Sequence, residues 1–429
     1  MAPEVAQLGR KARYMDGATT AWLLVAAALV LFMTPGLAFF YGGMDRSRNS
    51  LNMLMMSFWC LLTVPLLWAV LGYSLSFGGD GSFIGNFDFA FLSGTGIGED
   101  QGETLVWLVY LGAFATITPA LISGAVADRM KFSAWALFVP LWSLLVYVPV
   151  TFWIYGGSDD EGGLTGWLAA RGSLDFAGGT AIHVNAGIAA LAAVLVLGKR
   201  RGWPREGHPP HSMPMVMLGT AVLFFGWFGF NSGAGGLTDG VAVQAFANTF
   251  FAAAAGGLAW ALTERIKDGH FTNLGVASGI VAGLVAITPA AGFVGGMSSI
   301  WIGAAAGLIC AFAVSLKFKA GYDDSLDVVG VHLVGGLVGS LLIGFFAKPG
   351  ALGEFEAGLF NGGGLGLLTE QFIANAVTLV FSFVVTFVIL KALDATIGIR
   401  VSEEDEVTGL DVSQHAETAY NLGESTMAR

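Results

Sequence analysis

Two histidines carry the most informative chemistry in the chain, because each lies inside a long apolar run. His183 precedes Gly187 by four residues, and His332 precedes Gly336 by the same step. An ionisable side chain at membrane depth is costly and usually faces a cavity or a pathway. Imidazole donates or accepts hydrogen bonds and titrates near neutrality, which suits a proton relay or contact with a small polar solute. The alternative is a ring satisfied by a backbone carbonyl at a helix contact; the matched spacing favours function.

The sequence gives little indication of a metal site or of enzymatic activity. Two imidazoles without an intramembrane carboxylate or thiolate make a poor zinc shell, and Cys60 and Cys310 have no metal-ligand spacing. The sequence lacks HExxH, P-loop and GxSxG motifs. We therefore expect no metal, no cofactor and no enzymatic activity. The classes that remain are a passive channel, a coupled carrier and a membrane sensor.

Other polar and aromatic residues in the apolar runs could act together with these histidines. Asp175 precedes the run that contains His183, and we interpret it as a helix N-cap rather than a direct solute contact. Asp327, five residues before His332, is expected to have the matching role. The aromatic segment 224–231 contains two glycines, which leave room for a ring to move as a gate. Packing or a lipid-facing belt is the alternative for these rings.

Membrane-spanning helices must position these residues. Of 429 residues, 55% are hydrophobic and only 12% are charged, too apolar a composition for one aqueous core. The net charge of −11 has no accompanying basic stripe, so we expect no nucleic-acid partner. We predict an all-α integral membrane protein with about eleven spans, surrounded by lipid. They lie near 19–41, 51–77, 104–127, 134–155, 177–198, 214–234, 242–262, 274–291, 299–316, 326–347 and 370–393.

Charge bias and an internal repeat predict the topology. Most lysines and arginines fall in one set of alternate loops, which places the N-terminus outside and the C-terminus in the cytoplasm. A basic cluster at 10–13 is the contrary signal. The tetrapeptide 117–120 recurs at 287–290, and five spans separate both this pair and the histidines. An odd number of spans means that the two halves have opposite orientations, as in many transporters.

The predicted domains follow from these spans. A transmembrane domain covers 1–393, with inverted five-helix repeats at about 19–198 and 214–347 and a final helix at 370–393. The remaining 394–429 form a cytoplasmic tail, which contains the acidic run 403–406.

Several long motifs in the same order resemble the ammonium transporter family (Amt/Mep, related to the Rh proteins), in its Amt form. The segment 175–186, DFAGGTAIHVNA, is similar to the signature of that family. Further motifs are FFYGGM at 39–44, TPALI at 118–122, ADRMKFS at 127–133, GWFGFN at 226–231 and DVVGVH at 327–332. The resemblance covers essentially the whole chain.

This resemblance implies a homotrimer in the cell inner (plasma) membrane, with one narrow hydrophobic pore in each subunit. It implies that His183 and His332 are paired pore histidines, and that Phe114 and Phe230 are stacked rings that block the outer entrance. Trp227, Asn231 and Thr288 match pore-region positions. Asp175 matches a residue that orders the outer ammonium site.

The outer site departs from the family pattern. Tyr155 stands where a tryptophan is usual, Ala234 where a serine is usual, and Leu111 where a glutamine is common. Tyrosine still offers a cation–π contact, weaker than that of tryptophan. The missing serine hydroxyl removes a hydrogen bond of about 1 kcal/mol. We therefore predict weaker ammonium capture than in typical members.

The resemblance implies ammonium transport. We expect the solute to cross as ammonia, with its proton carried separately and net charge transferred. The alternatives are an ammonium sensor on the same fold and an Rh-like channel for neutral ammonia gas. The tail resembles a region that contacts neighbouring subunits and receives a trimeric PII signalling protein.

Overall fold

Long apolar helices form almost all of the regular structure. The computed structural model describes residues 16–96, 99–159, 163–236, 240–350, 352 and 355–420. Within these ranges there is no β-strand, and Met130 and Arg400 form an isolated antiparallel bridge. Ten helical segments are long and apolar enough to cross a membrane, and the shorter α12 (Asn273–Ile287) is also apolar. The predicted all-α membrane fold is confirmed, whereas the exact number of crossings stays a prediction.

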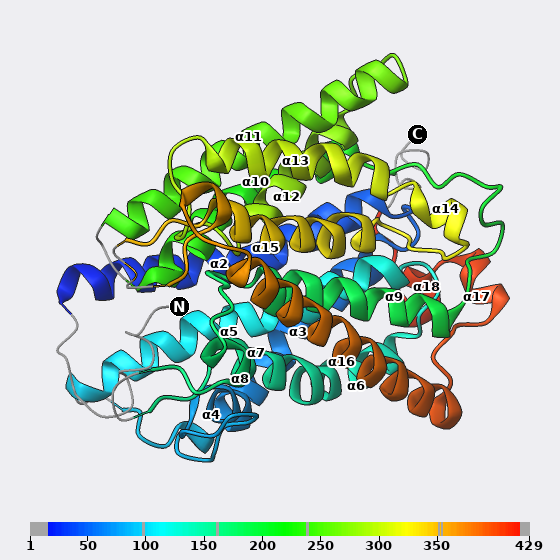
Figure 1. The fold of residues 1–429 in the computed structure, drawn as a ribbon. Coiled ribbons are helices and arrows are strands. Elements are labelled where there is room, and N and C mark those ends of the chain that lie inside the picture. The colour runs from blue at the N-terminus through cyan, green and yellow to red at the C-terminus, as the bar shows by residue number, and fades with distance from the viewer. Residues whose placement is uncertain are drawn as a thin grey trace.

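The helices run side by side between two ends of the molecule, with α17 and α18 at one end (Figure 1). The bounds in the first half are α2 (Gly17–Met44), α3 (Ser50–Leu67), η2 (Trp68–Gly72), α4 (Tyr73–Phe77), η3 (Ala90–Leu92), α5 (Glu99–Val126), α6 (Phe132–Trp142), η4 (Ser143–Tyr147), α7 (Val148–Tyr155), α8 (Trp167–Ala170), η5 (Gly179–Val184) and α9 (Asn185–Leu197). Those in the second half are α10 (Met213–Ser232), η6 (Gly233–Gly235), α11 (Gly240–Lys267), α12, α13 (Ser298–Ala313), α14 (Leu316–Ala320), η7 (Val329–Leu333), α15 (Val334–Phe346), η8 (Leu359–Asn361), α16 (Gly366–Ile397), α17 (Glu403–Thr408) and α18 (Leu410–His415).

One boundary difference concerns α12, which ends at Ile287 instead of near 291. Pro289 follows two residues later and has no backbone N–H with which to continue the helical hydrogen bonds. The chain then turns through 288–293. Sequence reasoning extended the helix because these residues are apolar, but hydropathy does not report backbone geometry.

Among the described residues, four short π-helical turns interrupt the spans. Pro65 precedes η2 by three residues, and Pro140 precedes η4 by the same number. Proline removes one helical hydrogen bond, which accounts for local widening of the helix. The other two turns, η5 and η7, contain His183 and His332. Each precedes a regular helix, so the two histidines occupy the same kind of local structure.

The glycines that follow the two histidines pack reciprocally. A Cβ atom at Gly187 would lie 2.5 Å from the backbone nitrogen of Leu333, the residue after His332. A Cβ atom at Gly336 would lie 3.1 Å from the backbone nitrogen of Val184, the residue after His183. Correspondingly, α9 packs against η7 and α15 packs against η5. This exchange of equivalent contacts is the one expected between two halves related by a local two-fold axis.

The described part of the tail folds back onto the helical bundle. The backbone N–H of Leu410 donates to Asn49 Oδ1 at 2.8 Å, and Asp411 Oδ1 accepts from the N–H of Asn52 at 2.8 Å. Glu406 accepts from Arg400 at 2.9 Å and from the backbone of Arg201 at 2.7 Å. The segment 402–420 is therefore an ordered surface at the end of the bundle.

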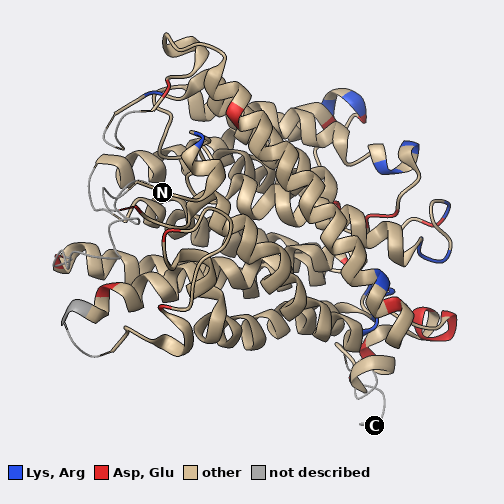
Figure 2. Cartoon of the chain, turned by 60° about the horizontal axis from the view of Figure 1, so that its bottom comes forward, with Lys and Arg blue, Asp and Glu red and all other residues tan. Residues whose placement is uncertain are grey.

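Most Lys and Arg residues gather at this same end of the helices, next to the acidic tail (Figure 2). That arrangement matches the charge bias from which a cytoplasmic C-terminus was predicted. The basic cluster at 10–13, which was the contrary signal, lies outside the described residues.

The reciprocal contact predicts that alanine substitutions at the two glycines lower thermal stability by different amounts. Replacing Gly187 with Ala should lower the midpoint of thermal unfolding in detergent, because the methyl group meets backbone atoms that cannot move independently; overpacking of this kind costs about 1–3 kcal/mol. Gly336→Ala should lower the midpoint less, since its nearest backbone atoms are farther away. Gly17→Ala is the matched control, because open space surrounds that position. An unchanged midpoint for Gly187→Ala would show that this contact does not limit packing.

Candidate functional site

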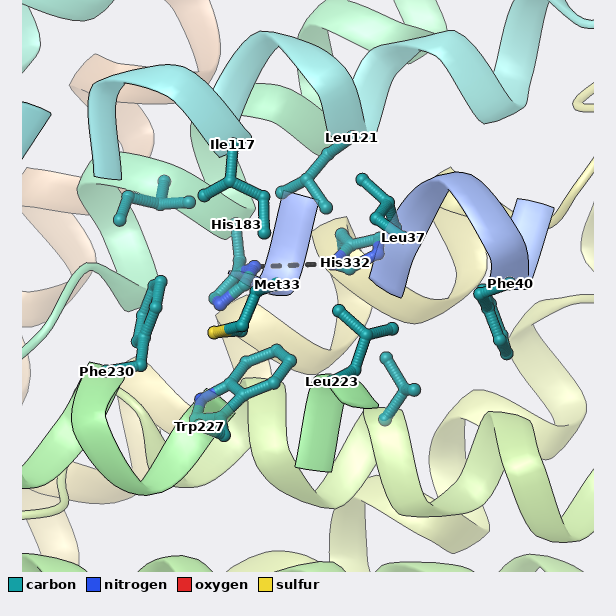
Figure 3. Close-up of a pocket in the computed structure, with 12 residues that line it drawn as sticks. Met33, Leu37, Phe40, Ile117, Leu121, His183, Leu223, Trp227, Phe230 and His332 are labelled. Atoms are coloured by element: carbon teal, nitrogen blue, oxygen red, sulfur yellow. Dashed lines mark hydrogen bonds between the residues drawn. The ribbon is translucent and has the colours of Figure 1, made fainter. Parts of the chain in front are cut away.

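The two histidines meet at the centre of the bundle. Their Nδ1 atoms are 3.2 Å apart, and the ring planes are nearly parallel at 19° (Figure 3). Both side chains are buried. Two facing Nδ1 atoms form a hydrogen bond only when one carries the hydrogen and the other accepts it. A neutral pair therefore has opposite tautomers, which leaves one bare Nε2 and one protonated Nε2.

A narrow, mostly apolar cavity contains this pair. Its volume is about 10 Å³, which leaves room for roughly one water molecule. The cavity is lined by Met33, Leu37, Phe40, Ile117, Leu121, Ile182, His183, Leu223, Trp227, Phe230, Val281 and His332. Among these side chains, the imidazole nitrogens are the polar atoms not used elsewhere. His183 Nε2 is buried and has no hydrogen-bond partner among the described residues.

Trp227 supports one face of the pair. Its ring lies 5.4 Å from that of His183 at an angle of 19°, and its Nε1 donates to Thr288 Oγ1 at 2.8 Å. Thr288 donates in turn to the carbonyl of Leu284 at 2.8 Å. Thr288 is thus placed behind Trp227, at the point where α12 ends, and does not itself line this cavity.

Phe114 and Phe230 are in ring contact at one end of the cavity, with centroids 4.2 Å apart. Figure 3 shows Phe230 at this end and Phe40 at the other. Phe230 also lies 6.1 Å from the ring of His183. The structure therefore brings the two predicted gate residues together, directly beside the histidine pair.

Tyr110 is a neighbour that the sequence interpretation missed. It lies one helical turn before Phe114 on α5, with the two rings 4.8 Å apart. Its hydroxyl donates to the carbonyls of Phe230 at 2.8 Å and Gly229 at 3.1 Å. Tyr110 thereby joins the two helices that carry the gate rings. The four-residue spacing from Phe114 was the available signal.

Asp175 caps the turn that carries His183. Its Oδ1 accepts the N–H groups of Gly178 at 2.9 Å and Gly179 at 2.7 Å, and its Oδ2 accepts those of Thr180 at 2.8 Å and Ala181 at 3.0 Å. Four charge-assisted hydrogen bonds fix the beginning of η5. The geometry agrees with the predicted capping role.

The matching cap on η7 is Asp324, not the expected Asp327. Asp324 accepts from the N–H groups of Val328 at 3.1 Å and Val329 at 2.7 Å. Asp327 instead pairs with Lys317 Nζ at 2.6 Å. Each cap precedes its histidine by eight residues, a spacing that could have identified Asp324. Burial raises the pKa of Asp324 to about 6.

The remaining predicted positions lie around the gate. Tyr155 ends α7 and Ala234 lies in η6, and both are buried. Asn231 directs its amide to Thr249 Oγ1 of α11, at 2.9 Å, and is absent from the cavity lining. Its observed contact is between helices rather than with the pore space.

Comparisons with known proteins agree with this architecture. Residues 21–420 match the Ammonium Transporter Family. An ammonium transporter of Mycobacterium tuberculosis is 49% identical over 433 aligned residues, covering 95% of this chain and 91% of that protein. The crystal structure of Candida albicans Mep2 has a TM-score of 0.83 at 35% identity, covering 91% of this chain and 88% of that one.

A structure described as a sensor Amt protein has a TM-score of 0.85 at 27% identity, covering 92% of this chain and 98% of that one. The family match spans most of the chain, and its relatives are named as transporters rather than enzymes. With its apolar helices, the chain is a multi-pass membrane protein and belongs to the ammonium transporter family.

Proposed function

We propose that this protein carries ammonium across the plasma membrane, passing it through the cavity as ammonia while the proton follows separately. The observation that supports this most directly is the hydrogen-bonded pair His183–His332, held in an apolar cavity behind the contact of Phe114 with Phe230. The transport of ammonium also agrees with the names of the curated relatives.

Desolvation explains why ammonia is the species that passes. An ammonium ion has four N–H donors and a full charge, and a nearly apolar cavity would leave most of its hydration uncompensated. Ammonia is neutral and close to water in size. It can accept a hydrogen bond from the protonated Nε2 of the pair and donate one to the bare Nε2. The histidines would thus guide the neutral molecule and relay the proton, which makes the cycle electrogenic.

The proposed outer site surrounds the gate. Asp175 orders the backbone there, while Tyr155 and Ala234 supply the surfaces that an arriving ion meets. Trp227, which was also expected in this outer site, lies against His183 in the histidine cavity instead. Asn231 and Thr288 support this region through their contacts with Thr249 and Trp227. In this proposal the ion is recognised outside Phe114 and Phe230, its proton is transferred to the bare Nε2 of the histidine pair, and the neutral molecule then crosses beside the pair.

We assign 1–393 to transport, in two inverted repeats with a final helix, and 394–429 to regulation. The homotrimer implied by the resemblance is part of this proposal. The segment 402–420 presents an acidic, ordered surface at the predicted cytoplasmic end, which suits a PII-type protein as partner.

A sensor is the second candidate, favoured by the structural match to a sensor Amt protein. A neutral-gas channel of the Rh kind is the third. The sensor would bind ammonium without net uptake, whereas the gas channel would support uptake without current. Uptake and current measured together therefore separate all three.

Replacing His332 with Ala should reduce the ammonium-evoked current at least tenfold on a supported membrane, because the partner hydrogen bond to His183 and the relay are lost. His270→Ala is the matched control, since that histidine is exposed after α11. If the unaltered protein takes up labelled substrate without any evoked current, the electrogenic mechanism is wrong.

Expression in a cell that lacks its own ammonium uptake should restore growth at low ammonium and acidic pH, where little free ammonia is present. Growth would be followed beside the His332→Ala variant, with membrane insertion checked by immunoblot. Absence of growth despite correct insertion would favour the sensor.

Pull-down with a PII protein should retain it in one nucleotide state and release it in another, so the measurement compares buffers with and without ATP and 2-oxoglutarate. Glu406→Ala, which removes the contacts with Arg400 and Arg201, should weaken retention by disordering the tail surface. Equal recovery on empty resin would contradict the proposed partner.

A further inference from the structure

A second cavity lies where α11 packs against α13 and α14, and it shares no lining residue with the cavity of the histidine pair. Its volume is about 280 Å³, far more than one water molecule needs. Both α11 and α13 end here, at the end of the molecule where most Lys and Arg residues gather (Figure 2). The cavity therefore has room for an organic group at the predicted cytoplasmic end.

A largely buried ion pair lines the inner part of this cavity. Lys317 Nζ donates to Asp327 Oδ1 at 2.6 Å and to the backbone carbonyl of Asp324 at 2.8 Å. The side chain of Lys317 is 11% exposed and that of Asp327 is 27% exposed. Among the described residues, the second carboxylate oxygen of Asp327 accepts no hydrogen bond. The lysine is thus satisfied within the protein, whereas the aspartate keeps an oxygen for a donor.

The other charged lining residues come from the last turn of α11 and the residue after it. Glu264 accepts from Trp260 Nε1 at 3.2 Å and from Thr272 Oγ1 at 2.8 Å, which holds its negative charge in the wall. Lys267 and Asp268 are 4.0 Å apart with exposed side chains, a pair that contributes little and leaves both groups open to a ligand.

The balance of charge in the cavity favours a ligand that carries a cation. Three carboxylates, those of Glu264, Asp268 and Asp327, face two lysines. The free carbonyl groups at the C-terminal ends of α11 and α13 add partial negative charge. A lone phosphate is therefore a poor fit, whereas a group with an ammonium and a phosphate matches both signs.

An apolar side of the same cavity continues into the membrane-facing surface. Trp260, Ala311 and Phe318 belong to its lining, and Phe318 is exposed. Leu308 and Phe312, on the neighbouring surface of α13, are large apolar side chains that are also exposed. Aromatic rings at the end of a span are typical of the boundary between lipid tails and headgroups. The cavity thus opens where a lipid headgroup would lie.

We propose that this cavity binds the headgroup of a phospholipid from the cytoplasmic leaflet, of the zwitterionic kind that ends in a primary ammonium group. The ammonium group donates to the second oxygen of Asp327 and is attracted by Glu264. The phosphate meets Lys267 at the entrance, and the acyl chains follow the apolar surface of α13. This inference goes beyond the proposed function, because it concerns a separate cavity and its test measures binding rather than transport.

The position of the site connects it to the histidine pair. Lys317 holds the carbonyl of Asp324, and the side chain of Asp324 caps the turn that carries His332. A headgroup on Asp327 therefore contacts the short segment 324–327 that begins this turn. Lipid composition would act there, at the base of η7, without entering the pore.

Native mass spectrometry of the full-length protein tests the assignment by measuring the dissociation constants of bound lipids. Palmitoyl-oleoyl phosphatidylethanolamine should bind about tenfold more tightly than the phosphatidylcholine with the same acyl chains, because a quaternary ammonium has no N–H donor for Asp327. The corresponding phosphatidylglycerol should also bind more weakly, since it lacks the cation.

Asp327→Asn should reduce the affinity for phosphatidylethanolamine to that for phosphatidylcholine, with Glu404→Gln on the exposed surface of α17 as the matched control. Lys267→Gln should weaken all three lipids alike, because all three carry the phosphate. Since Asp327→Asn leaves Lys317 without its partner and can unfold the protein, Ala311→Phe provides a second test. It fills the cavity without changing a charge and should abolish the preference, whereas Leu308→Phe on the exposed surface of the same helix should retain it.

Four outcomes would overturn the assignment. Equal affinity for the three lipids would remove the ammonium group from the argument, and an unchanged preference in Ala311→Phe would place the lipid elsewhere. Displacement of phosphatidylethanolamine by an equal concentration of glycerophosphoethanolamine would make a soluble molecule, not a lipid, the ligand. Cross-linking between subunits through Lys267→Cys, without lipid retention, would show that a second copy of the chain covers the cavity.

Discussion

The hydrogen bond between His183 and His332 is the interaction on which the rest of the pathway depends. A membrane interior penalises polar atoms that lack partners, so two imidazoles are stabilised there when one nitrogen of each is paired with the other ring. The shared Nδ1 hydrogen bond does this and forces opposite tautomers on the two rings. One consequence is chemical: the pair presents both an acceptor and a donor to a neutral molecule. The other is structural, because two π-helical turns that are far apart in the sequence must place the Nδ1 atoms of their histidines 3.2 Å apart.

The surrounding structure meets that requirement twice, in the same way. Asp175 and Asp324 each lie eight residues before a histidine and fix the backbone of the turn that carries it. Gly187 and Gly336 each let the following helix approach the opposite turn. Trp227 then restricts the His183 ring from one side, with Thr288 holding its indole N–H. Contacts with the apolar lining are not directional. The geometry of the histidine pair is therefore set by these caps, glycines and hydrogen bonds.

Sequence reasoning succeeded where a residue type has one physical explanation in its context. Apolar length predicted the spans, and a titratable ring in an apolar run identified His183 and His332. It failed where the decisive quantity was relative position in space. Asp327 and Asp324 are both acidic residues before η7, and only backbone geometry distinguishes the cap from the partner of Lys317. Likewise, nothing in the sequence shows that the hydroxyl of Tyr110 joins α5 to α10.

A continuous set of contacts also links the tail to the cap of η7. Glu406 of the tail accepts from the backbone of Arg201, and the adjacent Arg200 binds Asp323 at 2.8 Å. Burial alone would raise the pKa of Asp323, but the hydrogen bonds and charges of its arginine neighbours outweigh this and lower it, so it remains an anion. For the next residue, Asp324, burial prevails and the pKa rises to about 6. Asp323 thus anchors the loop to the segment that contacts the tail. Its neighbour Asp324, with the raised pKa, caps the turn of His332. Because they are consecutive, a movement of the tail that displaces Arg200 acts on the same short loop that orders the histidine pair.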